Sequence, residues 1–273
     1  MVTKDDYREG AVQAAHAVLL ELVHLLGAFR NDIVLIGGWV PGLLFPDSEP
    51  KHIGSTDVDL AFNHKTITNE TYETICNLLI KGGYKEGKQP FIFFRNIELY
   101  GKNYEVQVDL LAGEYEGTGK SRRHQKIQDI RARKARGCDL AFEQPIEVRI
   151  EGILPEGGKD SVLVRVSSIV PFIIMKSFAL ADRLKEKDAW DIHFCLQNYP
   201  GGLEALATAF QPFLLHGLVK EGLNNIAEKF ASIDHIGPKF VADFEGIDDN
   251  EKRAMRQREV YERIQTLLSI INK

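Results

Sequence analysis

Hydrophobic and polar positions follow two different patterns along the chain, and the change falls near Ser168. Before it, runs of alternating or wholly apolar residues predict β-strands. After it, almost every apolar pattern repeats at helical spacing. We therefore expect an α+β fold, with a mixed β-sheet flanked by helices at 1–167 and an all-helical C-terminal domain at 168–273. The predicted strands span 32–38, 57–62, 90–101, 103–113, 145–155 and 161–168.

Helices are also predicted within the first part. The segment from Asp5 to Leu26 is amphipathic and is followed by Gly27, a residue that often ends a helix. A short helix is expected after Gly38, and a longer one over 69–84. The strands at 90–101 and 103–113 are expected to pair as a hairpin through a Gly-Lys-Asn turn.

The predicted strand at 57–62 carries two carboxylates on one face. Val58, Leu60 and Phe62 alternate onto the face that enters the core, so Asp57 and Asp59 stand together on the other. Two anions held this close repel one another, and burying either is unfavourable unless a cation compensates. Because the chain has 39 acidic residues, a single Asp-x-Asp also arises by chance and then marks a solvated strand face.

A third carboxylate makes the chance interpretation weaker. In the strand at 103–113, Val106, Val108 and Leu110 share one face and Asp109 lies on the other. If this strand pairs beside 57–62, Asp109 joins Asp57 and Asp59. Three carboxylates in a small volume suit Mg²⁺, and two such ions stabilise both oxygens of a phosphoryl displacement.

Two glycines at a strand-to-helix junction add a possible phosphate site. Gly37 and Gly38 end the apolar strand at 32–38, where backbone N–H groups can approach an anion closely. Such a pair often marks only a tight turn, and it matches neither the P-loop nor the GxGxxG pattern. Followed by the Asp-x-Asp strand and the Asp109 strand, it is more specific than any of the three motifs alone.

The order Gly-Gly, Asp-x-Asp and a later Asp in an apolar strand resembles the DNA polymerase beta-type nucleotidyltransferases. The resemblance implies a nucleotidyltransferase fold and transfer of an NMP from an NTP. It also implies that Gly37 and Gly38 hold the triphosphate, that Asp57 and Asp59 bind two Mg²⁺ ions, and that Asp109 helps bind one ion and activates the acceptor hydroxyl.

A second motif, "KSFALADRLKEKDAWDIHF" (176–194), carries three cations. On one continuous helix Lys176, Arg183 and Lys187 would form a stripe able to neutralise a triphosphate. The alternative is a solvated helix face, with Asp188 capping a second helix and Asp191 completing the cap.

This second motif resembles the AbiEii-type nucleotidyltransferases, which include toxins of toxin–antitoxin systems and the related MenT-like toxins. The resemblance covers roughly 32–196. It implies that Lys176 is catalytic, that the NTP is handled by Arg183, Lys187, Asp188 and Asp191, and that an antitoxin protein is a partner. It further suggests nucleotide transfer to the 3′ end of tRNA.

The chain departs from this family's usual pattern after the diglycine. Trp39 stands where a Ser or Thr commonly contacts phosphate, and Ser55 or Thr56 could supply that hydroxyl. The connection from Gly38 to Asp57 is also long. "GGW" ahead of Asp-x-Asp is similar to aminoglycoside nucleotidyltransferases, so the acceptor could instead be a small molecule.

The segment from Lys120 to Arg136 contains eight Lys or Arg and one acid, and it follows the Asp109 strand. It could bind RNA at the rim of the site. No aromatic residues interleave for base stacking, and the alternative is an ordinary helix with a solvated basic face.

Composition limits the setting. The chain has 273 residues and a formal net charge of −5, so contact with nucleic acid requires a local basic patch. The three cysteines form no CxxC pair, which fits a reducing compartment and argues against a zinc ribbon. The charged N-terminal sequence does not fit a signal peptide, and no apolar run suits a membrane span. We expect a cytoplasmic protein with no membrane partner.

Three functions remain open: an RNA-directed toxin, a small-molecule nucleotidyltransferase, and a non-catalytic nucleotide-binding remnant. The complete carboxylate set disfavours the third, and the basic segment favours the first. His16, His24 and His193 are interpreted as structural.

Overall fold

The computed structural model describes residues 2–63, 66–67, 69–89, 91–112, 124–127 and 130–272. Contacts divide the chain into two compact units. The sheet unit comprises Tyr7–Leu43 and Gly54–Ser168, and the helical unit comprises Met1–Asp6, Leu44–Ile53 and Ile169–Lys273. One division falls at Ser168, where the sequence pattern changes. The segment 44–53, however, leaves the sheet unit and belongs with the helices.

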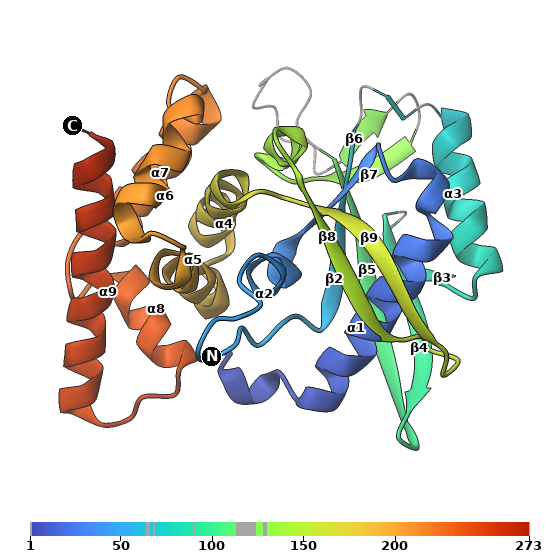
Figure 1. Ribbon diagram of the computed structural model, residues 1–273, viewed down its shortest axis with the longest axis horizontal. Coiled ribbons are helices and arrows are strands. Elements are labelled where there is room, and N and C mark those ends of the chain that lie inside the picture. The colour runs from blue at the N-terminus through green and yellow to red at the C-terminus, as the bar shows by residue number, and fades with distance from the viewer. Residues whose placement is uncertain are drawn as a thin grey trace. The chain divides into compact units, whose positions relative to one another are not determined.

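The sheet unit is built on a mixed β-sheet, as expected (Figure 1). Its main path has the order β3-β4-β5-β2-β1-β9-β8, and β6 and β7 pair off this path. β2 is parallel to β5, and β1 is parallel to β9. The strands are β1 Ile33–Ile36, β2 Asp57–Phe62, β3 Lys85–Glu86, β4 Ile92–Leu99, β5 Lys102–Ala112, β6 His124–Ile127, β7 Ile130–Lys134, β8 Ile146–Ile153 and β9 Lys159–Val166.

Helices and short 3₁₀ turns complete this unit. They are α1 Glu9–Leu25, η2 Gly27–Phe29, η3 Gly37–Trp39, α2 Val40–Leu44, α3 Asn69–Lys81 and η5 Cys138–Phe142. α1 contacts β2, β4, β5, β8 and β9 and therefore covers one face of the sheet. Glu21 of α1 accepts hydrogen bonds from the Tyr84 hydroxyl at 2.8 Å and from Arg95 of β4 at 2.9 Å, which fixes α1 against that face.

The hairpin between β4 and β5 turns one residue earlier than expected. Leu99 pairs with Lys102, so the turn residues are Tyr100 and Gly101, with φ of 52° and 71°. Positive φ at both positions is the type I′ geometry that suits the twist of a two-residue hairpin. The predicted Gly-Lys-Asn turn is wrong because alternation alone does not fix a turn to one residue.

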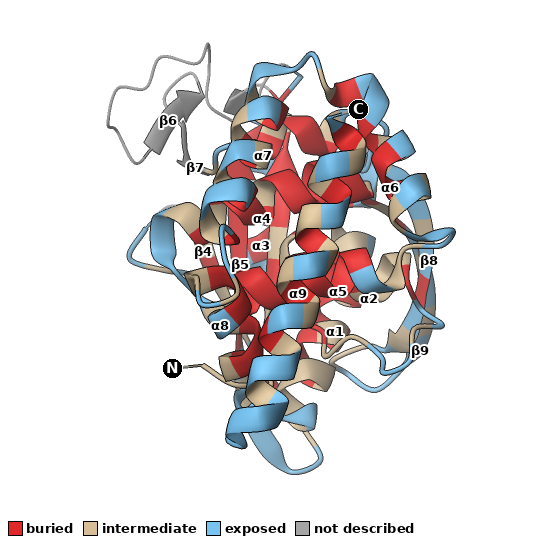
Figure 2. Ribbon diagram, turned by 90° about the vertical axis from the view of Figure 1, so that its left-hand side faces the viewer, coloured by how far each residue is buried: buried red, intermediate tan, exposed pale blue. Residues whose placement is uncertain are grey.

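The helical unit is centred on α5. Its elements are η1 Lys4–Asp6, α4 Ile169–Arg183, α5 Glu186–Asn198, α6 Gly202–Phe210, η6 Gln211–Phe213, α7 Gly217–Lys229, α8 Ile236–Phe244 and α9 Asn250–Ile271. α5 contacts α4, α6, α8 and α9 and is buried from Lys187 to Leu196. α9 is exposed along one side, whereas Val260, Ile264 and Leu267 are buried on the other (Figure 2).

Candidate active site

The three predicted carboxylates lie on one face of the sheet. The register of the parallel strands β2 and β5 sets Asp59 directly beside Asp109 and Asp57 beside Gln107. This register confirms the expected pairing of the two strands. Because aligned residues of neighbouring strands point to the same side of a sheet, the three acids share one face. The opposite face carries Val58, Leu60 and Phe62, which are at most 2% exposed. α1 covers that apolar face, and the acids project from the other.

Polar neighbours orient two of the acids. The Ser55 hydroxyl donates to Asp57 Oδ1, and Gln107 Nε2 donates to Asp109 Oδ1 at 2.7 Å. Asp109 is buried, at 4% exposure. The Ser55 hydroxyl, predicted to contact phosphate, is therefore bonded to Asp57 in this structure. Thr56 is half-buried in the bend that precedes β2.

Gly37 brings the diglycine to the carboxylates. It follows β1, whose last residue, Ile36, pairs with Asp59. Gly37 has φ of +74°, and a Cβ added there would stand 2.0 Å from Asp59 Oδ2. Only glycine combines this conformation with so close an approach. Gly38 is buried beside it in η3. The two motifs, 20 residues apart in the chain, thus meet at Asp59.

Trp39 has a structural role at this junction. Its side chain is 7% exposed, and its indole Nε1 donates to the backbone oxygen of Asp57 at 2.8 Å. The bond joins the segment after β1 to the first residue of β2. At the position where a phosphate-binding hydroxyl was expected, this chain has an N–H donor that binds its own backbone.

Cys138 also lies near Asp59, and no sequence motif predicts this. It begins η5, which contacts β1, β2 and β5. Burial raises the pKa of this thiol, and the nearby charges of Asp139 and Asp59 raise it further. A lone cysteine in a short apolar stretch carries no motif that would have assigned it to the site.

The second motif forms two helices instead of one. α4 ends at Arg183, Leu184 has φ of 49°, and α5 begins at Glu186. The predicted stripe on a continuous helix is therefore wrong. The second helix of the alternative interpretation is present as α5, but its predicted cap is wrong, because Lys185 holds the N-cap position and makes no side-chain cap bond.

The charged side chains of this motif are paired with one another. Lys176 Nζ lies 2.9 Å from Asp188 Oδ1 and 2.7 Å from Asp191 Oδ2. Arg183 Nε donates to Asp188 at 2.7 Å, and Lys187 Nζ donates to Asp191 at 2.9 Å. Both lysines and both aspartates are buried, so the alternative of a solvated face is wrong as well.

Mutual attraction keeps the buried members of the network charged. Burial by itself would lower the pKa of Lys176, but Asp188 and Asp191 outweigh it and raise that pKa. Burial acts in the opposite direction on Asp191, where Lys176 and Lys187 prevail and lower the pKa. Each charge thus compensates another within the helical unit, and a part for this motif in NTP handling stays a prediction.

His52 completes the network from a distant part of the chain. Its Nε2 lies 2.9 Å from Asp191 Oδ1, and its ring centroid lies 4.9 Å from that of Trp190. Burial lowers the pKa of His52 to about 4, although the hydrogen bond to Asp191 acts in the opposite direction. Sequence patterns could not pair two residues separated by 139 positions.

The basic segment is described in part. Residues 120–123 and 128–129 lie outside the described residues, while β6 and β7 form an antiparallel hairpin. β7 pairs in parallel with the end of β5, where Leu111 aligns with Arg133 and Ala112 with Lys134. The alternative of a helix is therefore wrong for 124–127 and 130–134. The backbone of β7 lies just beyond Asp109 along β5.

Two further observations bear on ligands and membranes. Among the residues that the structure describes, no group of three His, Cys, Asp or Glu side chains is arranged as a metal site. In the same part of the chain, none of the helices has the length and apolar character needed to cross a bilayer. Comparisons of this chain with protein-family models, with curated proteins and with solved structures find no match.

Proposed function

We propose that the protein is a Mg²⁺-dependent nucleotidyltransferase that transfers an NMP from an NTP to an acceptor hydroxyl. The observation that carries this proposal is the contact of Gly37 with Asp59, beside Asp109 on the neighbouring strand. A glycine turn meets the carboxylate of Asp59 there, and such an arrangement can seat a phosphate beside a carboxylate-bound metal ion.

The donor set fits Mg²⁺. Asp57, Asp59 and Asp109 supply hard oxygen ligands from one face, and they would hold two ions that stabilise charge on the transferred phosphoryl group. We base this assignment on the shared face of the acids rather than on a preformed cage. The backbone at Gly37 and Gly38 would seat the triphosphate, and Asp109, buried and oriented by Gln107, would accept the proton of the acceptor hydroxyl.

RNA, and specifically the 3′ end of tRNA, is the acceptor that we propose. The support is the pairing of β7 with the end of β5, because it brings the backbone of a strongly basic segment next to the Asp109 strand. Clustered Lys and Arg bind RNA by neutralising its phosphates. In this proposal the protein acts as a toxin that an antitoxin protein restrains.

Removing one acid tests the chemistry. We expect Asp59→Asn to lower the rate of transfer by about 10²–10³-fold, because a preorganised charge at the reacting phosphoryl group is lost. The assay supplies each of the four labelled NTPs with Mg²⁺ to total RNA and to a panel of small molecules. Glu105→Gln is the matched control, since Glu105 is an exposed carboxylate on the same strand and face as Asp109.

The outcomes separate the candidate functions. Label on tRNA that depends on Asp59 supports the proposal, and growth inhibition that Asp59→Asn relieves supports the toxin role. Label on an aminoglycoside and never on RNA would replace the acceptor. Transfer that survives Asp59→Asn, or that falls equally in Glu105→Gln, would contradict the assignment of the carboxylates.

A further inference from the structure

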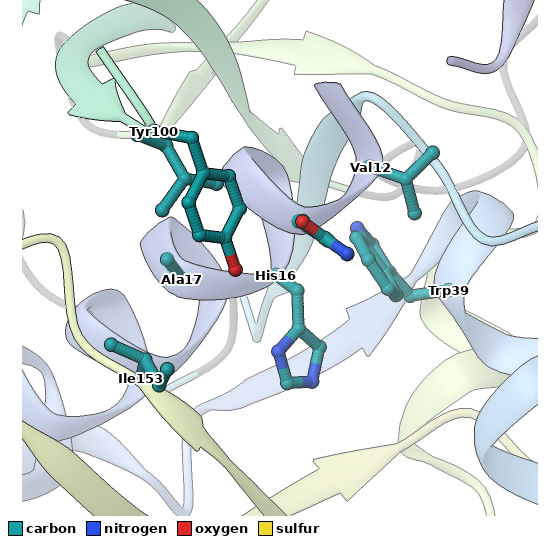
Figure 3. Close-up of a pocket in the computed structure, with 8 residues that line it drawn as sticks. Val12, His16, Ala17, Trp39, Tyr100 and Ile153 are labelled. Carbon is teal, nitrogen blue, oxygen red and sulfur yellow. The ribbon is translucent and has the colours of Figure 1, made fainter. Parts of the chain in front are cut away.

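A separate cavity of about 370 Å³ lies in the sheet unit, against α1 and away from the carboxylate face. It is lined by residues of α1, η3, β8 and the β4–β5 turn, and its volume lies within the range of small-molecule sites. Three rings, those of His16, Trp39 and Tyr100, surround the same space (Figure 3). Gln13, Val12 and Ile153 also line it.

Two of the rings are held rigidly. Trp39 is tied by its Nε1 to the backbone of Asp57, and Gly54 packs so closely that an added Cβ would lie 3.3 Å from the indole. The His16 ring packs against β8, where a Cβ on Gly152 would lie 2.9 Å from Cε1. The two rings stand 5.5 Å apart at 52°. Rings fixed before a ligand arrives need little ordering on binding, which favours affinity.

The third ring stands at an unusual position. Tyr100 occupies the tip of the β4–β5 hairpin with φ of 52°, and it is 77% exposed. A bulky residue at positive φ is strained, and Asn or Gly is preferred at this position of a type I′ turn. Such strain is typical of residues held in place for function.

The polar groups of the cavity are uncharged, and those of His16 and Tyr100 are available, whereas the Gln13 amide donates to Glu9 at 3.0 Å. Within the described residues, neither the ring nitrogens of His16 nor the Tyr100 hydroxyl has a hydrogen-bond partner. Burial lowers the pKa of His16, so its imidazole is neutral near pH 7. The lining includes no Lys, Arg, Asp or Glu. The site therefore suits a flat, neutral ring with hydrogen-bonding groups at its edge and offers nothing to a phosphate.

We propose that this cavity binds a nucleobase, which stacks between Tyr100 and the fixed rings of Trp39 and His16. The base reaches the site either as a free nucleoside or as an unpaired base of an RNA strand. This site is distinct from the proposed NTP site, because it lies on the α1 side of the sheet while the acids project from the other side. Trp39 joins the two through its bond to Asp57.

The test measures binding alone, so it does not depend on nucleotide transfer. Adenosine, adenosine 5′-monophosphate and a short single-stranded oligoadenylate are titrated by calorimetry and by quenching of tryptophan fluorescence. We expect adenosine to bind at least as tightly as its monophosphate. Stronger, salt-dependent binding of the oligoadenylate would identify RNA as the source, and weaker binding would identify the free nucleoside.

Two variants and a control assign the binding to this cavity. His16→Ala and Tyr100→Asn should each weaken adenosine binding about tenfold, since each removes a ring that stacks on the base. Ile146→Ala changes an exposed apolar residue of β8 outside the cavity and should leave binding unchanged.

Stability separates a functional from a structural role for Tyr100. Asn-Gly is the preferred type I′ pair, so the Tyr100→Asn variant should unfold at the same urea midpoint as the native protein or at a higher one. It should nevertheless bind adenosine more weakly. Absence of adenosine binding to the native protein, or equal binding by Tyr100→Asn, would overturn the proposal.

Discussion

Gly37 is the residue at which backbone conformation and candidate chemistry coincide. Its positive φ and its contact with Asp59 leave no room for a side chain. We predict that Gly37→Ala lowers the free energy of unfolding by ~1–3 kcal/mol, because the strained conformation and the displaced carboxylate both oppose folding. It should also abolish transfer, as measured by labelled-NTP assay alongside urea unfolding.

Gly27→Ala is the matched control for this change. Gly27 has no atom within 4 Å of an added Cβ, and it does not adopt a positive φ. We expect its stability to stay within about 0.5 kcal/mol of the native protein. Equal losses of stability and of transfer in the two variants would contradict a specific role for the contact between Gly37 and Asp59.

At the residue scale, the sequence predicted the acids better than their neighbours. Alternation predicted that Asp57 and Asp59 share one face of their strand and that Asp109 lies opposite the apolar face of its own, because side chains in a strand repeat every two residues. Bringing the three acids together also required β2 to pair with β5, which alternation does not specify. The proximity of Cys138 to Asp59 depends on how η5 folds over three strands. No local pattern encodes such a contact.

At the scale of elements, the joint between α4 and α5 is held by the buried Lys176–Asp188–Asp191 group. We predict that Lys176→Met lowers the free energy of unfolding by ~3–5 kcal/mol, since it removes a cation from two buried carboxylates. Chemical denaturation measures the effect. Lys185→Met, at an exposed position of the same joint, should change stability by less than about 0.5 kcal/mol.

The same pair of variants distinguishes the two roles considered for Lys176. If Lys176→Met is as stable as the native protein yet fails to transfer nucleotides, Lys176 acts on the substrate, as the family resemblance implies. A loss of stability that exceeds that of Lys185→Met supports the structural role seen in the network.

Element types were largely predictable, whereas breaks and partners were not. Periodicity located β1, β2, β5 and the C-terminal helices. The end of α4 could not be predicted, because Leu184 adopts positive φ and the sequence there has no Gly, Asn or Pro, the residues that usually mark a helix end. The two interpretations drawn from the sequence, a stripe facing a triphosphate and a solvated helix face, both left out the buried network that forms, because charged residues are rarely fully buried.

At the scale of the whole molecule, buried histidines link stability to pH. Burial lowers the pKa of His52 to about 4 and that of His193 to about 3. An unfolded histidine has a pKa of about 6.5, so between pH 6.5 and 4 the unfolded chain binds protons that the folded chain does not. We predict that the free energy of unfolding falls on acidification through this window, by up to ~1.4 kcal/mol per pH unit for each histidine.

His193 isolates one part of this dependence. Both ring nitrogens of His193 are buried without a hydrogen-bond partner in the described chain. His193→Leu should therefore flatten the pH dependence without loss of stability at pH 7.5, where the ring is neutral. Urea unfolding across the window measures both, and an unchanged slope would contradict the prediction.

The division into units was predictable only at Ser168. The segment 44–53 groups with the helices because His52 pairs with Asp191 and because Phe45 packs on Phe194 and Tyr199. These contacts join parts of the chain that are far apart in sequence. A change of periodicity marks where strands give way to helices along the chain. It does not predict that an earlier segment, such as 44–53, packs against the later helices.

The excursion of residues 44–53 restricts how the gene can be divided. A fragment that starts at residue 169 would encode α4 to α9 without the imidazole that Asp191 binds and without the ring that covers Phe194. A fragment that stops at residue 168 would contain the segment 44–53 without the helices that this segment packs against. No single cut yields either half intact, so dissection, fusion or shuffling of this chain must keep both together.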